Sequence, residues 1–465
     1  MYRIRSRPFL ISFFLCCIAS LVVACGSSGT GSHPTVGTTP VASPTSTSST
    51  PPTNGGGSPA SISTTVPMPA MQMSCPAAGT ARAAVIAPLA LGSHQNIVYI
   101  VNQGPSDAPT LGTLKRYDVT TGNKTEILNL SKTYISEAQV STDGQWILFV
   151  AVASGQAKLQ LIRMDGQGLQ TLYCASPPSN GANTASSLHD VQWSSDQKLL
   201  IFDSYTSSGS AVDLLNMQNG RVQSEISLRG TAIDYPPLTW LDTTRVYLLA
   251  PEIDGPSSSL YLLDTAQGTD RNPQNLPVVV APPDTFCWDS DSSYDGTQLY
   301  TSGCTTDPNP SRPGIADQRG PSTINVRPAT GGSPHTIFTN AGMAITAVRA
   351  INKTTLLFLV ENNSFIGNAD TSQNGLWKVN TDGTGLTRLT SDGGGVSAGP
   401  SNFGLFTQDP WSNVSRDGTL FALQHNSANG KTQSLLFGSL NGGTSTTFAS
   451  ISDGTQLSIV GWTRM

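Results

Sequence analysis

Nine charged, polar and aromatic residues stand at similar places in the chain, each near the start of a short run of alternating apolar residues. They are Glu137, His189, Asp190, Asp234, Tyr235, Trp288, Asp289, Asp409 and Trp411. Carboxylates gathered from several such runs would form an anionic opening that attracts a cation, an amine or a basic peptide. Taken one at a time, each Asp is better explained as the cap of a turn and each Trp as part of the core. The collective pattern is therefore what predicts a binding site.

Motifs for metal binding and catalysis are sparse. The five histidines are scattered and show neither His-x-His nor His-Glu-x-x-His spacing. Asp289–Gly296 is a poor calcium loop because its glycine stands at the eighth position, whereas a calcium-binding turn of this kind needs it at the sixth. We predict no catalytic residue, no metal and no cofactor. Carboxylates that cleave a glycosidic bond remain an alternative, with Asp190, Asp289 and Asp409 as the candidates.

The elements that must position these residues are short strands. Between Ile135 and Leu172, apolar residues alternate in four bursts, and Asp143-Gly144 and Asp165-Gly166 separate the first two and the last two of them. Period-2 patterning bounded by Asp-Gly predicts antiparallel hairpins. A single meander of four strands cannot bury both of its faces alone. We therefore expect the unit to repeat.

The unit does repeat along the chain. Six segments align on its first hairpin turn: 141–151, 194–204, 241–251, 293–303, 351–361 and 415–425. A second hairpin follows each of them, at 159–172, 212–228, 260–276, 323–338, 376–390 and 434–448. Radial repetition of four-stranded units is typical of a β-propeller. The fold class predicted is all-β.

The first blade is split between the two ends of the chain. Residues 96–103, 112–121 and 123–130 supply only three strands, and the last strand, 456–462, aligns with 188–193 and 235–240 because each places a Trp two residues after an apolar residue. The C-terminal strand should therefore complete the first blade and remove free edges. This predicts a seven-bladed propeller. Six or eight blades remain alternatives, since residues 82–91 would change the count if they formed a strand.

The turn-and-strand signature resembles the TolB-type, WD40-like propeller repeat, whose core reads S-x-D-G-x-x-h-h-F. Ser141-Thr142-Asp143-Gly144 with Phe149, and Ser415-Arg416-Asp417-Gly418 with Phe421, carry it best. The segments that begin at Leu241 and Ile351 depart from the motif, so those blades rest on patterning alone. The resemblance covers the chain from about residue 95. It implies a fold and says little of function, because propellers host many activities.

Long insertions are expected on one face of the ring. The loops at Ser176–Ser187, Gly303–Ser322, Asn362–Asn374 and Ser391–Thr407 all join strands on the side where the innermost strands begin. The turns of the other side are mostly tight Asp-Gly or Asn-Gly pairs. Long loops on one side of a rigid scaffold favour a binding face. The alternative is drift, because surface insertions cost little.

The N-terminus is expected to be a targeting signal. Arg3, Arg5 and Arg7 precede the apolar run Pro8–Ala24, which suits a signal peptide. The run ends in Leu21-Val22-Val23-Ala24-Cys25, which resembles the bacterial lipobox. That resemblance implies cleavage after residue 24, a lipid on Cys25 and attachment to the bacterial cell membrane, facing outside the cytoplasm. A plain signal peptide or a signal anchor, with an incidental Cys, is the alternative.

These features divide the chain into 1–24 (lipoprotein signal peptide), 25–74 (disordered tether) and 75–465 (propeller). The tether is Ser, Thr, Pro and Gly with few large apolar residues, so it cannot offset the entropy of ordering. Only 12% of residues are charged and the net charge is −5. Without clustered Lys and Arg, nucleic acid is excluded as an expected partner.

Four cysteines lie in the mature domain, and an even number in an exported chain predicts disulfides. If Asp295-Gly296 centres a hairpin, positions that sum to 591 face each other, as Cys287 and Cys304 do. Cys75 and Cys174 are then left to pair.

The function predicted is a binding or scaffold module for a protein, a peptide or an envelope glycan on the long-loop face. One alternative is an extracytoplasmic propeller hydrolase or lyase that acts on polysaccharide. A spacer without a specific ligand is the other.

Overall fold

The chain folds into a β-propeller whose described part begins at residue 74. The computed structural model describes residues 74–77, 89–106, 108–175, 187–206, 209–229, 235–250, 259–281, 290–293, 295–308, 316–362, 370–390, 413–426, 432–452 and 455–465. The predicted signal peptide, the predicted lipidation site Cys25 and nearly all of the predicted tether lie outside these residues. In the part described, no helix is both long and apolar enough to span a membrane.

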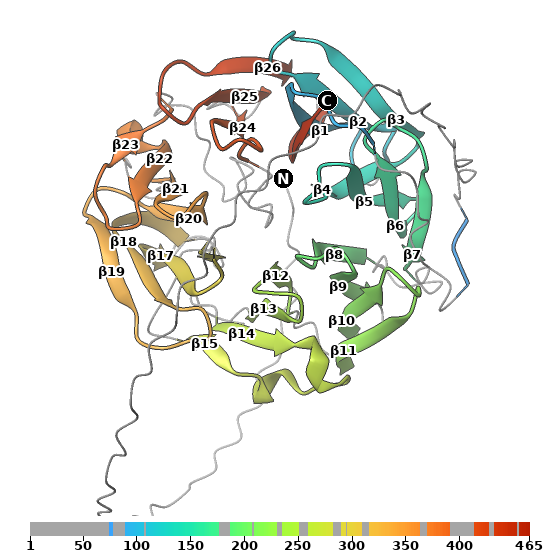
Figure 1. Cartoon of the computed structure of the whole chain (residues 1–465), viewed down its shortest axis with the longest axis horizontal. Coiled ribbons are helices and arrows are strands. Elements are labelled where there is room, and N and C mark those ends of the chain that lie inside the picture. Colours follow the sequence, from blue (N-terminus) through green and yellow to red (C-terminus); the bar gives the residue numbers. More distant parts are fainter. Residues whose placement is uncertain are drawn as a thin grey trace, which may run out of the picture. The chain divides into compact units, whose positions relative to one another are not determined.

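Seven sheets form the blades, which are arranged as a ring (Figure 1). Blade 1 contains β27 (Gln456–Arg464), β1 (Gln95–Gln103), β2 (Leu111–Asp118) and β3 (Lys124–Ser131). Blade 2 contains β4 (Tyr134–Val140), β5 (Trp146–Ala153), β6 (Gln156–Arg163) and β7 (Gln170–Cys174). Blade 3 contains β8 (Ser187–Trp193), β9 (Leu199–Thr206), β10 (Gly209–Asn216) and β11 (Val222–Arg229). Blade 4 contains β12 (Pro237–Trp240), β13 (Arg245–Ala250), β14 (Ser259–Asp264) and β15 (Val278–Val280).

The remaining three blades follow in chain order. Blade 5 contains β16 (Ser290–Ser292), β17 (Gln298–Pro308), β18 (Ala316–Pro328) and β19 (His335–Asn340). Blade 6 contains β20 (Ile345–Ala350), β21 (Thr355–Val360), β22 (Gly375–Asn380) and β23 (Thr387–Arg388). Blade 7 contains β24 (Leu420–Asn426), β25 (Gln433–Ser439) and β26 (Thr446–Ile451), with a bridge from Val414 to Phe421 on the inner side of β24. Short 3-10 helices are η1 (Thr265–Gln267), η2 (Pro273–Asn275) and η3 (Thr371–Gln373). The prediction of seven blades is confirmed.

The repeated Ser-x-Asp-Gly turn has a clear physical basis. The Ser141 hydroxyl donates to Asp143 Oδ1 at 2.5 Å and accepts the Trp146 N–H at 2.9 Å. The same carboxylate oxygen accepts the Gln145 N–H at 3.0 Å, and Gly144 has a φ of 75° that suits glycine. Local side-chain acceptors thus satisfy the backbone of the turn before any strand pairs. The motif therefore fixes where the first two strands of a blade meet.

The C-terminal strand closes the ring, as predicted. β27 pairs antiparallel with β1, from Gln95 opposite Arg464 to Asn102 opposite Gln456, and Figure 1 shows the red C-terminal strand beside β1. Arg416 of blade 7 reinforces this closure from the tight-turn side. Its guanidinium donates to the Trp462 carbonyl at 2.8 Å and to the carbonyls of residues 141 and 142 in blade 2. One side chain thus joins blades 7, 1 and 2.

Most of the apolar core lies between neighbouring blades. Leu148 of blade 2 and Phe202 of blade 3 belong to one buried cluster. Tyr99 of blade 1 and Phe448 of blade 7 meet edge to face in another, with ring centroids 5.5 Å apart. Each sheet is therefore covered on both faces by its neighbours, which is what a single meander lacks.

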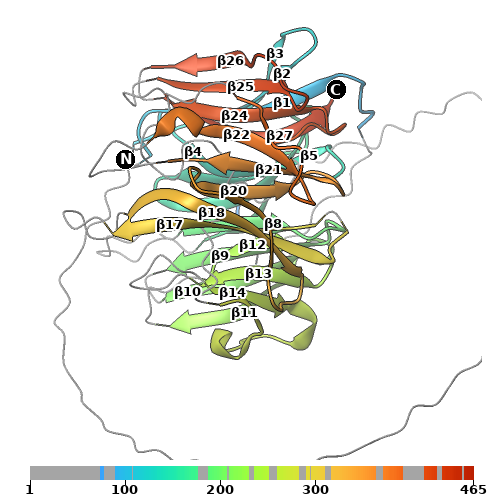
Figure 2. The same cartoon turned by 90° about the vertical axis from the view of Figure 1, so that its left-hand side faces the viewer.

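Two connections differ from the sequence prediction. Residues 303–322 were expected to form a long loop, but most of them extend the β17–β18 ladder, up to Pro308 opposite Ala316. Figure 2 shows this hairpin reaching past the ends of β9 and β10. The second hairpin of blade 4 was placed at 260–276, but its outer strand is β15, because η1 and η2 occupy the connection. The face on which only tight turns were expected therefore carries a longer connection in blade 4, and the opposite face carries an extended hairpin in blade 5.

The predicted pairing of Cys75 with Cys174 is confirmed, with Cα atoms 5.7 Å apart. It attaches the segment before blade 1 to the outer strand of blade 2. The register of β16 and β17 pairs Ser290 with Thr301 and Ser292 with Leu299, so the positions sum to 591 as expected. Cys287 and the side chain of Cys304 lie outside the described residues, and their disulfide stays a prediction.

Candidate functional site

Four of the nine predicted mouth residues lie in the described part of the chain. Glu137 and Asp190 line the same cavity, and the His189 ring contacts Glu137. Tyr235 instead packs beside Tyr261 in the cluster between blades 3 and 4, with ring centroids 6.0 Å apart, so its role is structural. The other five, namely Asp234, Trp288, Asp289, Asp409 and Trp411, lie outside the described residues.

The cavity lies where innermost strands begin. Its volume is about 450 Å³, and strands of blades 1, 2, 3 and 7 contribute its walls. In Figure 1 these strands, among them β4, β8 and β24, face the centre of the ring. We call this cavity the channel mouth. Its size falls in the range of pockets that hold small molecules.

Glu137 and His189 form the charged part of the channel mouth. Nδ1 of His189 lies 3.4 Å from Oε1 of Glu137, and the other carboxylate oxygen accepts the Val191 N–H at 3.3 Å. The hydrogen bond to Glu137 raises the pKa of His189, burial opposes it, and Asp190 and Asp203 add to the rise. The chain is bent here: Asp190 has a φ of 53° and the β8–β9 register shifts between His189 and Gln192. This irregularity directs the polar residues toward the channel.

Five glutamines line the rest of the channel mouth, and sequence analysis did not single them out. They are Gln139, Gln192, Gln424, Gln433 and Gln456. The repeat could have revealed two of them, because the position two residues before the turn serine is polar in blades 2, 3, 5 and 7. Its occupants there are Gln139, Gln192, Asp291 and Asn413. Within alternating strands each looks like an ordinary solvent-facing residue.

Side chains at these positions join one innermost strand to the next. Oε1 of Gln139 accepts the Trp193 N–H at 3.3 Å, and Oδ2 of Asp291 accepts the Ala350 N–H at 2.8 Å. An innermost strand has a row of N–H groups without a strand partner, so acceptors from the neighbouring blade satisfy them. Burial raises the pKa of Asp291 to about 6, and the charge of Arg349 opposes that rise.

A second cavity of about 480 Å³ occupies the tight-turn end of the channel. Gln139 and Gln192 line both cavities, so the two are halves of one central channel. Trp193 and Trp240 form part of its wall, and the Trp240 indole donates to the Gln192 carbonyl at 3.3 Å. This end is therefore built largely by groups that also hold the blades together.

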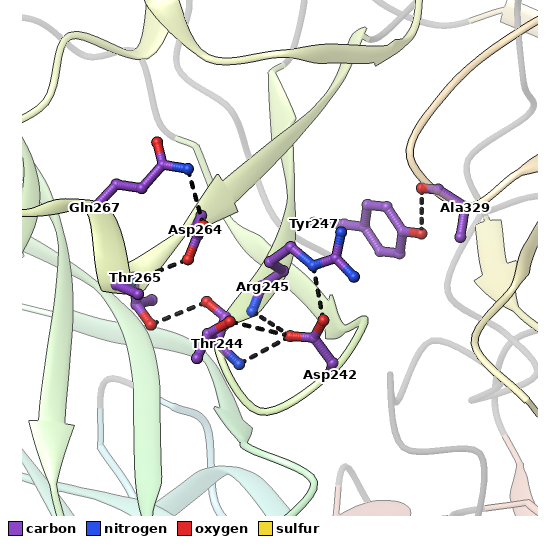
Figure 3. Close-up of polar contacts among 9 residues, drawn as sticks. Asp242, Thr244, Arg245, Tyr247, Asp264, Thr265, Gln267 and Ala329 are labelled. Carbon is purple, nitrogen blue, oxygen red and sulfur yellow. Dashed lines mark hydrogen bonds and ion pairs between the residues drawn. The ribbon is translucent and has the colours of Figure 1, made fainter.

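A third cavity, of about 340 Å³, lies on blade 4 beside η1 and η2. Polar groups of its lining pair with other groups of the protein, as Figure 3 shows for Arg245, Asp264 and Gln267. Nε of Arg245 donates to Asp242 at 2.7 Å, and Asp264 accepts the Gln267 amide at 2.9 Å. The Tyr247 hydroxyl donates to the Ala329 carbonyl at 2.7 Å. These contacts hold the connection between β14 and β15, which contains η1 and η2, in place. The channel mouth is therefore the better candidate site.

A buried acid directly follows β21 in blade 6. Glu361 is 3% exposed and accepts the Thr346 hydroxyl at 2.8 Å through Oε2, and its Oε1 has no hydrogen-bond partner within the described part of the chain. Burial raises the pKa of Glu361 from 4.5 to about 8. The group is therefore neutral at pH 7.

Glu361→Gln should remove a pH dependence of stability. The folded protein keeps this proton up to about pH 8, whereas the unfolded chain releases it near its ordinary pKa. Between these values the unfolded state binds fewer protons, so the stability of the native protein falls as the pH rises. We expect the variant to lie within about 1 kcal/mol of wild type at pH 5 and to exceed it by several kcal/mol at pH 9, at about 1.4 kcal/mol per unit of pKa difference, because wild type must then hold an ionised carboxylate in a buried site. Urea unfolding at both pH values measures this.

Glu126→Gln, at an exposed acid, is the control. A variant that loses stability at pH 9 as wild type does would contradict the assignment.

Metal and catalytic constellations were also sought. Among the described residues, no group of three His, Cys, Asp or Glu side chains is placed to hold a metal ion. One Gly-x-Ser-x-Gly stretch, Gly395–Gly399, lies outside them. A nucleophile elbow requires a helix directly after the motif, and the Pro400, Ser401 and Asn402 that follow here are poor helix formers.

Comparison with known proteins finds distant similarity to solved structures. No family model and no curated protein matches the chain. Among solved structures, TolB from Acinetobacter baumannii is 13% identical with a TM-score of 0.40, covering 64% of this chain and 63% of its own. The periplasmic gluconolactonase PpgL from Pseudomonas aeruginosa is 13% identical with a TM-score of 0.48, covering 78% and 99%. Putative TolB from Agrobacterium tumefaciens is 14% identical with a TM-score of 0.38, covering 64% and 89%. The chain thus spans less than two thirds of the first of these proteins, and the likeness is one of fold alone.

Proposed function

We propose that this chain is a membrane-anchored extracytoplasmic lipoprotein whose β-propeller is a binding module, and that its ligand enters the channel mouth. The observation that carries the proposal is a cavity of about 450 Å³ lined by polar side chains from four blades. Polar groups that converge on a preformed cavity are typical of a binding site. The lipobox-like Leu21–Cys25 and the Ser/Thr/Pro/Gly stretch behind it support the anchor and the tether.

No described geometry favours an enzyme over a binding module. Two of the three carboxylates that would act on a glycosidic bond, Asp289 and Asp409, lie outside the described residues. The third, Asp190, lines the channel mouth together with Glu137, whose carboxylate oxygens contact the His189 ring and accept the Val191 N–H. The described part of the site thus offers one carboxylate pair, Glu137 and Asp190, and no second observation that favours hydrolase or lyase chemistry.

Photo-crosslinking of the full chain in the cells that produce it tests the binding role. A photoreactive phenylalanine derivative replaces Ser458, an exposed residue that lines the channel mouth. The matched control carries the same group at Asn441, an exposed position in a tight turn. We expect several-fold more adduct from position 458 than from position 441. Equal or no capture at both positions would contradict the proposal. In the same preparation, an unmodified thiol at residue 25 would contradict the anchor.

A further inference from the structure

We propose that the channel mouth binds a neutral saccharide through side-chain amide N–H donors. This rests on the proposed binding role of the same cavity and names the chemistry of its ligand. Three glutamines carry the inference: Gln139 on β4, Gln433 on β25 and Gln456 on β27. They come from three blades, and all three line the one cavity.

Each of these amides already uses its oxygen within the protein. Oε1 of Gln139 accepts the Trp193 N–H at 3.3 Å, and Oε1 of Gln433 accepts the Leu457 N–H at 2.5 Å. Since a backbone N–H only donates, these contacts fix which end of the amide is the oxygen. Oε1 of Gln456 accepts the Tyr134 hydroxyl at 2.5 Å.

The nitrogen ends of the three amides are therefore what the cavity offers. Each Nε2 carries two N–H donors, and none makes a hydrogen bond to another group of the protein among the described residues. Donors that converge from three blades call for several acceptor atoms on one compact ligand. Hydroxyl, ether and carbonyl oxygens can accept these hydrogen bonds, and so can the oxygens of anions.

The charges around the cavity exclude the anions. Glu137 and Asp190 contribute two carboxylates, the imidazole beside them, His189, is paired with Glu137 at 3.4 Å, and no Lys or Arg belongs to the described lining. A carboxylate or phosphate ligand would be repelled by both acids. An amine would suit the acids, but it would leave the three amide nitrogens facing a group that cannot accept a hydrogen bond. The acceptor atoms are thus uncharged oxygens.

A saccharide satisfies both kinds of group at once. Each hydroxyl can accept from an amide and donate to the Glu137 carboxylate. The C–H faces of the ring fit the aliphatic part of the wall, which includes Val191, Leu457 and Ile459. Hydrogen bonds to an ionised acceptor are about twice as strong as neutral ones, so Glu137 would fix the orientation of the ring. A peptide offers carbonyls as well, but it spaces them along a chain instead of around a ring.

Binding of defined probes to the full chain in detergent tests the proposal. The neutral probes are cellobiose and N,N′-diacetylchitobiose; digalacturonate, spermidine and trialanine represent an anion, a cation and a peptide. Saturation-transfer NMR and calorimetric titration give the affinities. We expect a neutral disaccharide to bind, and the other three probes to bind at least tenfold more weakly.

The deciding variants are Gln139→Glu and Gln433→Glu. Each keeps the oxygen that accepts the neighbouring N–H, so the blades stay joined, and each replaces the N–H donors by an acceptor. We expect at least a tenfold weaker affinity for the disaccharide in both. Gln218→Glu, on an exposed turn, should leave the affinity unchanged. Thermal unfolding of each variant verifies that the fold is intact.

The outcomes separate this inference from the proposed function. A preference for trialanine, spermidine or digalacturonate, unaltered affinity in both glutamate variants, or no binding of either disaccharide would overturn the saccharide proposal. In each of these cases, specific photo-crosslinking at position 458 would still support the binding role. Loss of the adduct in the presence of the disaccharide would support both.

Discussion

Removing the disulfide between Cys75 and Cys174 should lower the free energy of unfolding by about 2–4 kcal/mol. The bond joins residues 99 apart in the sequence, and a cross-link that closes so long a loop removes much conformational freedom from the unfolded chain. The double variant Cys75→Ser/Cys174→Ser avoids leaving one free thiol to exchange with other cysteines. Its urea midpoint, compared with that of wild type at the same pH, measures the loss.

The native structure strengthens this expectation. The segment after Cys75 is held at two further places, where the Leu89 N–H donates to the Gln145 side chain at 2.7 Å and where His94 exchanges backbone hydrogen bonds with Met465. The bond therefore joins parts that are already in position. As the control, wild type and the double variant are both unfolded in reductant, where the two midpoints should coincide because the Cys75–Cys174 bond is then absent from both. If the double variant without reductant instead kept the midpoint of wild type, the link would not stabilise the propeller.

The turns and their registers were predictable because their causes are local. Asp-Gly pairs set the hairpins, and period-2 alternation sets which residues face the core. The rule that facing positions sum to 591 holds for Ser290 and Thr301 for this reason. The closing role of β27 was visible in Trp462, which aligns with Trp193 and Trp240 at the end of an innermost strand.

The elements that were missed lack such a local signal. Residues 305–308 contain Thr, Asp and Pro without apolar alternation, so their pairing with the strand opposite, which rests on backbone hydrogen bonds, left no trace in the pattern. The amide donors of the channel mouth were hidden for a different reason. Gln139 is far in sequence from Gln433 and Gln456, and only ring closure brings blade 7 and the β27 strand of blade 1 beside blade 2.

Ring closure through β27 should itself be costly to disturb, and Trp462→Ala is expected to destabilise the protein by about 3–5 kcal/mol. The Trp462 side chain is 0% exposed and packs with Ile97, Tyr99 and Phe448 between blades 1 and 7. Truncating a buried aromatic side chain removes its transfer free energy and leaves a cavity. The midpoint of chemical unfolding should fall accordingly.

Trp462→Phe separates packing from hydrogen bonding at the same position. Nε1 of Trp462 is buried and has no hydrogen-bond partner among the described residues, so the substitution removes ring area together with a polar group that is unsatisfied. Loss of that group offsets part of the loss of packing. We therefore expect the Phe variant to lose less than half of what the Ala variant loses. Equal losses in the two variants would mean that the indole N–H matters, and a negligible loss in both would mean that the last strand does not hold the ring closed.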